Sequence, residues 1–439
     1  MDYTINEVLQ FVAENDVKFV KLAFNDIFGV SKTISIIADE LPRAFKSGVS
    51  FEASKVDGFL TKEEQDLFLF PDPATLAVLP WRPAQGRVVR FYCNTRHLSG
   101  DPFEGDGRNI LKMAVAKAAQ MGYTCKIGSE CEFYLFEMDQ LGNPTQVPHD
   151  QAGYMDIAPL DKAENVRREI CLTLEEMGIK PESSHHEQGP GQNEIDFRYS
   201  DALTAADDLV TFKGVVRTIA ARNGLFASFM PRPIKDQHGS GLRIDLSLYK
   251  NGVNLFENFT TEQNPQAQSF IAGIIHHIGE MTAFLNPITN SYSRFGRLEA
   301  PKYITWSNQN RAQLIRIPAA KGDLSRMELR SADPSCNPYL TFALLILAGM
   351  DGISNNMTLG DPSNFNLYAC HPKDLTGIPT LPDNLGEALQ LAQQSEFIKA
   401  IFPPFVLETI FREKFSLWEN YCSAQDKDAF EKETYFKTV

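Results

Sequence analysis

Charged residues at every second position of several β-like segments are the feature that most constrains the fold of this chain. In the segment 125–136, Glu130 and Glu132 are two residues apart, so on a strand both carboxylates point to the same side of the sheet. Two carboxylates held side by side repel each other unless a cation lies between them. The pattern therefore predicts a sheet with one polar face and a cation site on that face.

Three further segments share this alternation: 185–197, which is predicted to form a hairpin, 242–247, and 326–330. Our hypothesis is that these polar faces line one cleft. Carboxylate oxygens are the ligands that Mg²⁺ and Mn²⁺ prefer. The predicted metal ligands are Glu130, Glu132, Glu187, Glu194 and Glu328.

Alternating charge on a strand also has an ordinary explanation, a solvated sheet face, and for any single strand this explanation is favoured. Five such strands, two of them with paired carboxylates and others with arginine, favour a functional site instead. The spacing alone does not identify the reaction.

The predicted elements divide the chain into two parts. Segments 17–24 and 29–36 alternate around a turn as in an antiparallel hairpin, which predicts a small β-rich N-terminal domain over residues 1–101. A stretch rich in Gly, Pro and acidic residues, 99–107, is the predicted linker. Helical patterns and short strands alternate over 102–439, which predicts a large α+β domain. The predicted helices are 163–177, 205–222, 267–284 and 338–354.

The composition excludes several classes of protein. A formal charge of −14 and a pI near 5.1 argue against a nucleic-acid partner, because such proteins carry a basic surface. The seven cysteines are scattered and never spaced as CxxC, so they are predicted to be free thiols. Residues 1–20 have no long apolar core, and the apolar stretch 339–350 is too short to cross a bilayer. We therefore expect a cytoplasmic protein with no membrane partner.

Ordered motifs run along nearly the whole chain. They are GSECEFYLF at 128–136, SHHEQGPGQNEI at 184–195, FMPRP at 229–233 with GSG at 239–241, NPITNSY at 286–292, NR at 310–311 with IRIP at 315–318, and RMELRSADP at 326–334 with NPYL at 337–340. In these motifs the chain resembles glutamine synthetases of the bacterial type I group. The resemblance implies a β-grasp-like N-terminal domain and a catalytic domain with a curved antiparallel sheet. It also implies a dodecamer of two hexameric rings whose neighbouring subunits share each site.

The resemblance implies an ATP-dependent ligase with two divalent cations. Glu132, Glu187 and Glu194 match ligands of the cation on the glutamate side, while Glu130 and Glu328 match ligands of the cation that orients the ATP γ-phosphate. Metal ions that bridge phosphate oxygens neutralise charge in phosphoryl transfer.

The resemblance also assigns nucleotide, substrate and proton-transfer positions. The guanidinium group suits planar recognition of phosphate and carboxylate. For the histidine and serine assigned to the nucleotide side, a less favoured alternative is that they are ordinary hydrogen-bonding residues. The assigned residues are Arg311 and Arg316 for phosphate and nucleotide, His185 and Ser247 on the nucleotide side, His238, Gly239, Arg294 and Arg330 for the substrate, and Glu52 and Glu299 as proton acceptors.

One departure from the family pattern concerns the second cation. Where the family has a metal-binding histidine, this chain has Arg243, which stays protonated and has no lone pair to donate. Three outcomes follow for that cation: it binds more weakly, it is displaced by the guanidinium, or it is retained while Asp245 pairs with Arg243.

Other departures lie at the substrate and amine positions. Glu52 replaces the family aspartate that binds ammonium, Lys55 lies three residues later, and His238 replaces an asparagine. The flap at 293–301 is one residue shorter than the family pattern. Such a loop would close over the acyl phosphate and exclude water.

These observations support a ligase that phosphorylates the γ-carboxylate of glutamate before ammonia or an organic amine attacks. The departures favour, as an alternative, a different amine or a different carboxylate. A second hypothesis is a catalytically weak member that serves as a binding or regulatory assembly. A kinase on a related fold, which would release a stable phosphorylated product, ranks last.

Overall fold

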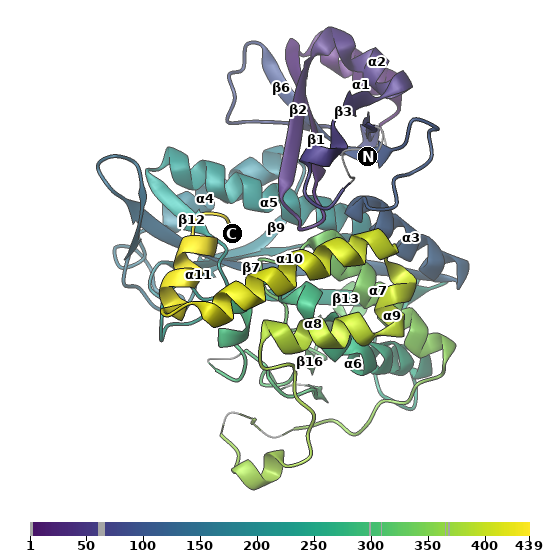
Figure 1. The fold of residues 1–439 in the computed structure, drawn as a ribbon, viewed down its shortest axis with the longest axis vertical. Helices are drawn as coiled ribbons and strands as arrows, with labels where there is room; N and C mark the ends of the chain where they lie inside the picture. The colour runs from purple at the N-terminus through teal and green to yellow at the C-terminus, as the bar shows by residue number, and fades with distance from the viewer. Residues whose placement is uncertain (1–2, 60–65, 298–299, 309, 365, 368) are drawn as a thin grey trace.

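A computed structural model describes residues 3–59, 66–297, 300–308, 310–364, 366–367 and 369–439. Figure 1 shows a small N-terminal sheet with two helices above a larger part, in which helices surround a second sheet. This arrangement confirms the predicted α+β class and the small β-rich N-terminal part.

The N-terminal sheet has the strand order β2-β1-β6-β4-β3, and β5 pairs with β6. The predicted hairpin is confirmed, because β1 and β2 pair antiparallel around a turn. Strand β6 then pairs parallel to β1, and α1 and α2 flank the sheet (Figure 1). The elements are α1 Ile5–Glu14, β1 Val17–Asn25, β2 Ser31–Ile37, α2 Leu41–Ser47, β3 Val49–Phe51, β4 Leu67–Pro71, β5 Ala77–Val78 and β6 Arg87–Arg96.

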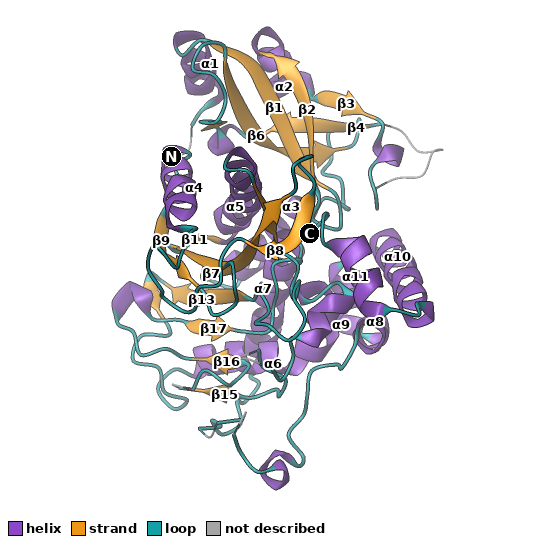
Figure 2. Ribbon diagram, turned by 90° about the vertical axis from the view of Figure 1, so that its left-hand side faces the viewer, coloured by secondary structure: helices purple, strands orange, loops and turns teal. Residues whose placement is uncertain are grey.

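The larger sheet follows the order β15-β16-β17-β13-β7-β10-β9, with β8, β11 and β12 also paired to β7 and β14 paired to β13. Figure 2 shows these strands following one another from β9 to β15 along one side of the molecule. The predicted hairpin over 185–197 is confirmed, since β9 and β10 pair antiparallel. The principal strands are β7 Tyr123–Met138, β9 Pro181–His186, β10 Gln192–Phe197, β12 Leu225–Ser228, β13 Leu242–Lys250, β15 Trp306–Ser307, β16 Ile315–Arg316 and β17 Met327–Leu329.

Helices pack against this sheet, and loops make up much of the lower part of the molecule (Figure 2). The four predicted helices are confirmed as α4 to α7, and almost the whole length of α7 is buried. Helix α3 and the C-terminal helices were not predicted. The helices are α3 Gly107–Gln120, α4 Glu164–Glu176, α5 Ala202–Arg222, α6 Pro265–Leu285, α7 Pro338–Ser354, α8 Leu385–Gln394, α9 Glu396–Ile401, α10 Pro404–Ser423 and α11 Lys427–Tyr435.

The stretch predicted as a linker, 99–107, is packed between the two parts. Phe103 is fully buried there, and Arg108 follows at the start of α3. The Arg108 guanidinium forms ion pairs with Asp72 at 2.9 Å and with Asp207 at 2.8 Å. Because Asp72 precedes β6 and Asp207 lies on α5, this arginine ties the N-terminal sheet to the larger part. Among the described residues, no helix is both long and apolar enough to cross a membrane.

Candidate active site

The central strand β7 brings acidic side chains from neighbouring strands together. On one side it pairs with β10, which places Glu194 opposite Glu132 and Asp196 opposite Glu130. On the other side it pairs with β13, which places Arg243 opposite Glu130. Because directly opposed residues point to the same face of a sheet, all five side chains share one face.

The guanidinium of Arg243 lies within this group of carboxylates. Its Nη1 donates to Glu130 at 2.7 Å and to both carboxylate oxygens of Glu194 at 2.9 Å. Its Nη2 donates to Glu132 at 3.1 Å. One arginine therefore connects three of the predicted metal ligands, which come from two different strands.

The carboxylates outnumber the single positive charge at their centre. Burial raises the pKa of Glu194 well above its ordinary value even though Arg243 favours the charged form. Burial also raises the pKa of Glu132, and the nearby Glu187 adds to the rise. Burial opposes the charge on Arg243, but Glu194 and the other carboxylates outweigh it and raise the guanidinium pKa. The cluster retains an excess of negative charge that a further cation would relieve.

The hairpin of β9 and β10 supplies the remaining predicted ligand of the first cation, Glu187, and places His185, which was predicted on the nucleotide side, beside it. His185 Nε2 lies 3.0 Å from Glu187 Oε1, and the backbone N–H of Gln188 donates to Glu187 at 3.0 Å. Burial opposes ionisation of Glu187, but the contact with His185 lowers its pKa below the ordinary value. His185, Glu187 and Glu194 each offer a ligand atom, all within 4.8 Å of one another. This donor set fits a divalent cation.

A second acidic group has ligand atoms within 4.8 Å of one another, contributed by Glu130, Asp245 and Glu328. Four positive charges face these three negative ones, so the donor set does not fit an additional divalent cation. The guanidinium groups already paired with it belong to Arg243, Arg316, Arg326 and Arg330.

The contacts of this second group contradict one outcome considered for Arg243. Asp245 pairs with Arg326 at 2.8 Å, so it does not neutralise Arg243. Arg316 donates to Glu328 at 3.1 Å on one oxygen, and Arg330 donates to the other. Burial opposes ionisation of Glu328, but Arg330 and Arg316 lower its pKa.

The substrate positions predicted from the sequence line a small cavity beside the carboxylates, with a volume of about 40 Å³. It is lined by Glu132, Glu187, Gln188, Gln192, His238, Gly239, Gly241, Arg243, Arg294, Ala300 and Arg330. Arg294 is buried and donates to the backbone oxygen of Ser331 at 3.3 Å. A Cβ atom at Gly239 would lie 2.7 Å from both Arg294 and the backbone oxygen of Pro231, so only glycine fits this position.

The other predicted residues lie apart from the cluster or make different contacts. Arg311 is exposed. Burial lowers the pKa of the neighbouring Arg316, and the positive charge of Arg311 adds to this effect. Ser247 is buried and donates to the backbone oxygen of Ser325 at 3.1 Å. Glu52 is 61% exposed on the N-terminal domain, 3.8 Å from Lys55. Glu299, predicted as a proton acceptor, lies outside the described residues.

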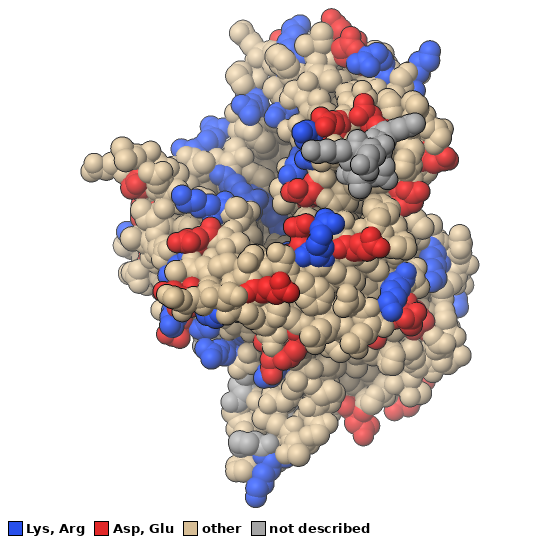
Figure 3. Space-filling model, viewed as in Figure 1, with Lys and Arg blue, Asp and Glu red and all other residues tan. Residues whose placement is uncertain are grey.

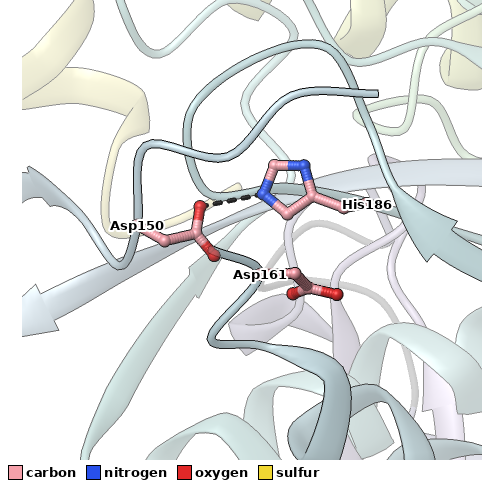
Figure 4. Close-up of side chains that lie close together, drawn as sticks. All are labelled: Asp150, Asp161 and His186. Carbon is pink, nitrogen blue, oxygen red and sulfur yellow. Dashed lines mark hydrogen bonds and ion pairs between the residues drawn. The ribbon is translucent and has the colours of Figure 1, made fainter. Parts of the chain in front are cut away.

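Two polar features of the cluster were not predicted. Gln192 donates to Glu132 and to the backbone oxygen of Gly239, both at 3.2 Å. His186 is fully buried and contacts Asp150 at 2.8 Å through Nε2 (Figure 4). Its Nδ1 lies 2.6 Å from the Glu187 backbone oxygen. Both ring nitrogens face acceptors, and although burial opposes the charge, the hydrogen bond and charge of Asp150 raise the pKa of His186, which favours the doubly protonated imidazole. The motif at 184–195 contains Gln192 and His186, but alternation along a strand gives no information about their partners.

The third member of this buried group is Asp161, which lies beside Asp150 and His186 in Figure 4. Arg167 forms an ion pair with Asp161 at 2.6 Å. Because Asp161 is paired with Arg167 and Asp150 with His186, this group supports the end of β9, which directly precedes Glu187, and does not resemble a metal site.

A larger cavity of about 900 Å³ lies between the N-terminal hairpin and helices α5 and α10. Figure 3 shows it as a hollow beneath the N-terminal domain, with basic side chains on its wall. None of its lining residues belongs to the predicted site. The small cavity beside the carboxylates is therefore the candidate active site.

Comparisons with known proteins agree with this geometry. Residues 16–97 match the model of the glutamine synthetase beta-Grasp domain, and residues 104–433 match that of the glutamine synthetase catalytic domain. Among curated proteins, the chain is 46% identical to a glutamine synthetase of Clostridium saccharobutylicum over 95% of this chain and 96% of that protein. It is 45% identical to one of Methanosarcina mazei over 95% of both chains. Among solved structures, a complex of GmaS with ADP superposes with a TM-score of 0.87 at 30% identity, covering 99% of each chain.

Proposed function

Because this chain belongs to the glutamine synthetase family, we propose that it is an ATP-dependent glutamate–ammonia ligase that acts through a γ-glutamyl phosphate. The observation that carries the proposal is the buried cluster of carboxylates beside a small cavity lined by arginines. Membership of the family was expected from the motifs and is confirmed by the comparisons.

The first step joins the two substrates. A γ-carboxylate oxygen of glutamate attacks the γ-phosphorus of ATP, and the bond from that phosphorus to the ADP oxygen breaks. Arg316 and Arg330 would bind phosphate and carboxylate oxygens, because their guanidinium groups already contact a carboxylate at this edge of the cluster. When bound, a divalent ion would neutralise part of the phosphate charge. The residues proposed to hold this ion are Glu132, Glu187 and Glu194.

The second step forms the amide. Ammonia attacks the acyl carbon, the carbon–oxygen bond to the phosphate breaks, and inorganic phosphate leaves. The proton lost by the nitrogen passes to a carboxylate, for which Glu299 and Glu52 are proposed. Arg294 and Gly239 would position the glutamate, since both line the cavity.

The identity of the ion and the assembly are also proposals. Oxygen donors suit Mg²⁺ or Mn²⁺, and ATP is the co-substrate that the family uses. The exposed position of Glu52, away from the carboxylates of its own chain, supports a ring in which each N-terminal domain completes the site of a neighbour. We propose a dodecamer of two such rings, working in the cytoplasm on small-molecule substrates.

An organic amine in place of ammonia is the second candidate. The specific observation is the pair of Glu52 and Lys55, 3.8 Å apart, at the position where the resemblance places the ammonium site. The longer carboxylate and the added lysine change the charge and the space that an incoming amine meets at this position. Glutamine synthesis would then be slower than ligation of a substrate that the altered position accepts.

Release of ADP by the full-length protein tests these candidates. The assay combines ATP and glutamate with ammonia, methylamine, ethanolamine or a polyamine, and the product is identified by mass. We expect ADP release that requires both glutamate and an amine. If no amine raises ADP release above that with ATP alone, the ligase proposal fails and a binding assembly remains. A stable phosphorylated product without amide would indicate a kinase.

A further inference from the structure

Arg243 stands where the resemblance implies a metal-binding histidine. We infer that its guanidinium takes the place of the second divalent cation, so that each chain binds one divalent ion and not two. The inference rests on the proposed ligase function, because it concerns the charges that face ATP and glutamate in the same site.

The position of Arg243 within the cluster is the first argument. It donates to Glu130, a predicted ligand of the second cation, at 2.7 Å, and to Glu132 and Glu194, predicted ligands of the first, at 2.9–3.1 Å. A single planar group thus contacts the ligands of both predicted cations. Three carboxylates hold it, and a guanidinium remains charged at any pH at which the protein is folded.

The balance of charge around Glu130 is the second argument. Glu130, Asp245 and Glu328 could surround an ion, since their ligand atoms lie within 4.8 Å of one another. However, they are paired with Arg243, with Arg326 at 2.8 Å, and with two further arginines on Glu328. A divalent ion placed there would be repelled by four fixed positive charges at close range.

The first cation is affected differently. His185, Glu187 and Glu194 offer ligand atoms within 4.8 Å, and Glu187 makes no ion pair with Arg243 among the described contacts. Glu130, Glu132, Glu187 and Glu194 carry four negative charges, and Arg243 supplies one positive charge among them. One divalent ion therefore nearly neutralises the group. The structure therefore separates a position that still needs a cation from one where arginine already supplies the charge.

The number of Mn²⁺ ions bound per chain tests this inference. We would titrate the full-length protein with Mn²⁺ in the absence of nucleotide, which itself chelates Mn²⁺, and measure free Mn²⁺ by its electron paramagnetic resonance signal. The expected result is one equivalent per chain. Arg243→His is expected to bind a second equivalent, whereas the matched control Arg243→Lys, which keeps the positive charge, is expected to remain at one.

Two equivalents bound by the unmodified protein would overturn the inference. If Asp245→Asn then abolished the second equivalent, the ion would lie between Glu130, Asp245 and Glu328. The unmodified protein gives a result even if Arg243→His does not fold. One bound equivalent with no ADP release for any amine would uphold the ion count and overturn the ligase function, so the two failures are distinguishable.

Discussion

Nη1 of Arg243 lies 2.9 Å from both carboxylate oxygens of Glu194. The two residues belong to β13 and β10, which pair with opposite edges of β7. Their contact therefore crosses β7 on the polar face of the sheet and joins three strands at one point. The pairing of the strands brings the charged cluster together, and such preorganisation favours a catalytic site.

Loss of the Glu194 charge is expected to weaken binding of the divalent ion. Glu194→Gln removes one charged ligand and leaves Arg243 with fewer partners, so we expect Mn²⁺ affinity to fall by about 100-fold, the range in which losses around a metal site lie. Titration of free Mn²⁺ measures the change. Glu182→Gln is the matched control, because Glu182 is exposed on β9. Equal affinity of the Glu194 variant and this control would contradict the assignment.

Removal of the Asp150 charge is expected to destabilise the strand that leads to Glu187. Burial opposes ionisation of Asp150, but the hydrogen bond and charge of His186 lower its pKa to about 2. Asp150→Asn leaves a buried imidazolium without its counter-ion, which typically costs about 3 kcal/mol in the free energy of unfolding. Denaturant unfolding measures the loss.

A double-mutant cycle checks that this loss belongs to the pair. Once Asp150→Asn has been made, His186→Gln should cost much less than it does alone. Additive losses for the two changes would show that the residues act independently.

The charge of Asp208 is expected to make stability fall as pH rises. Burial, with a contribution from neighbouring Asp207, raises the pKa of Asp208 to about 7. The folded state therefore holds this proton more tightly than the unfolded chain, and stability declines from about pH 4 until the group is fully ionised above pH 7.

Asp208→Asn removes the ionisable group, so the variant should be more stable than the parent at high pH. We expect a free energy of unfolding about 1–2 kcal/mol higher than that of the parent at pH 8, and little difference at pH 4. The range is below the full value of the shift because the side chain is only partly buried. Asp39→Asn, at an exposed position, should change neither value by more than about 0.5 kcal/mol. A variant less stable than the parent at pH 8 would refute the prediction.

The Arg108 guanidinium is expected to hold the two parts of the chain together. Its ion pairs with Asp72 and Asp207 are largely buried, so Arg108→Ala leaves two carboxylates without their counter-ion. We expect a loss of about 3 kcal/mol in the free energy of unfolding. Arg43→Ala, which removes an exposed ion pair with Glu40, should cost less than about 1 kcal/mol. Similar losses for both variants would contradict the role of Arg108.

The hairpin of β9 and β10 and the shared face of Glu130 and Glu132 were predictable, because alternation determines the face of each side chain. The partner of Arg243 was not, because alternation leaves the register between distant strands undetermined. Arg243 and Glu130 are 113 residues apart in the sequence, and only the pairing of β13 with β7 makes them neighbours. The same limit explains why Asp245 was considered a partner of Arg243, whereas Asp245 pairs with Arg326, which directly precedes the adjacent strand β17.

The buried supports of the site were harder to predict than the site itself. Asp150 and Asp161 lie in a segment between strand and helix, where no periodicity marks which polar residues are buried. His186 lies beside Glu187 in a recognisable motif, yet its burial depends on the packing of that segment over β9. Helix α3 was missed because the Gly- and Pro-rich stretch before it was interpreted as a linker, although Asp106 caps the helix.

Transfer of oxygen from glutamate to phosphate is the most direct test of the central claim, which is that the chain activates the γ-carboxylate as a phosphate ester. Glutamate labelled with ¹⁸O in both γ-carboxylate oxygens is incubated with ATP, the divalent ion, the amine and the full-length protein, and the phosphate released is analysed by mass. Our account predicts one ¹⁸O atom in each phosphate and one in each amide product. Phosphate without the label would contradict it, because the γ-phosphoryl group would then have passed to water and not to glutamate.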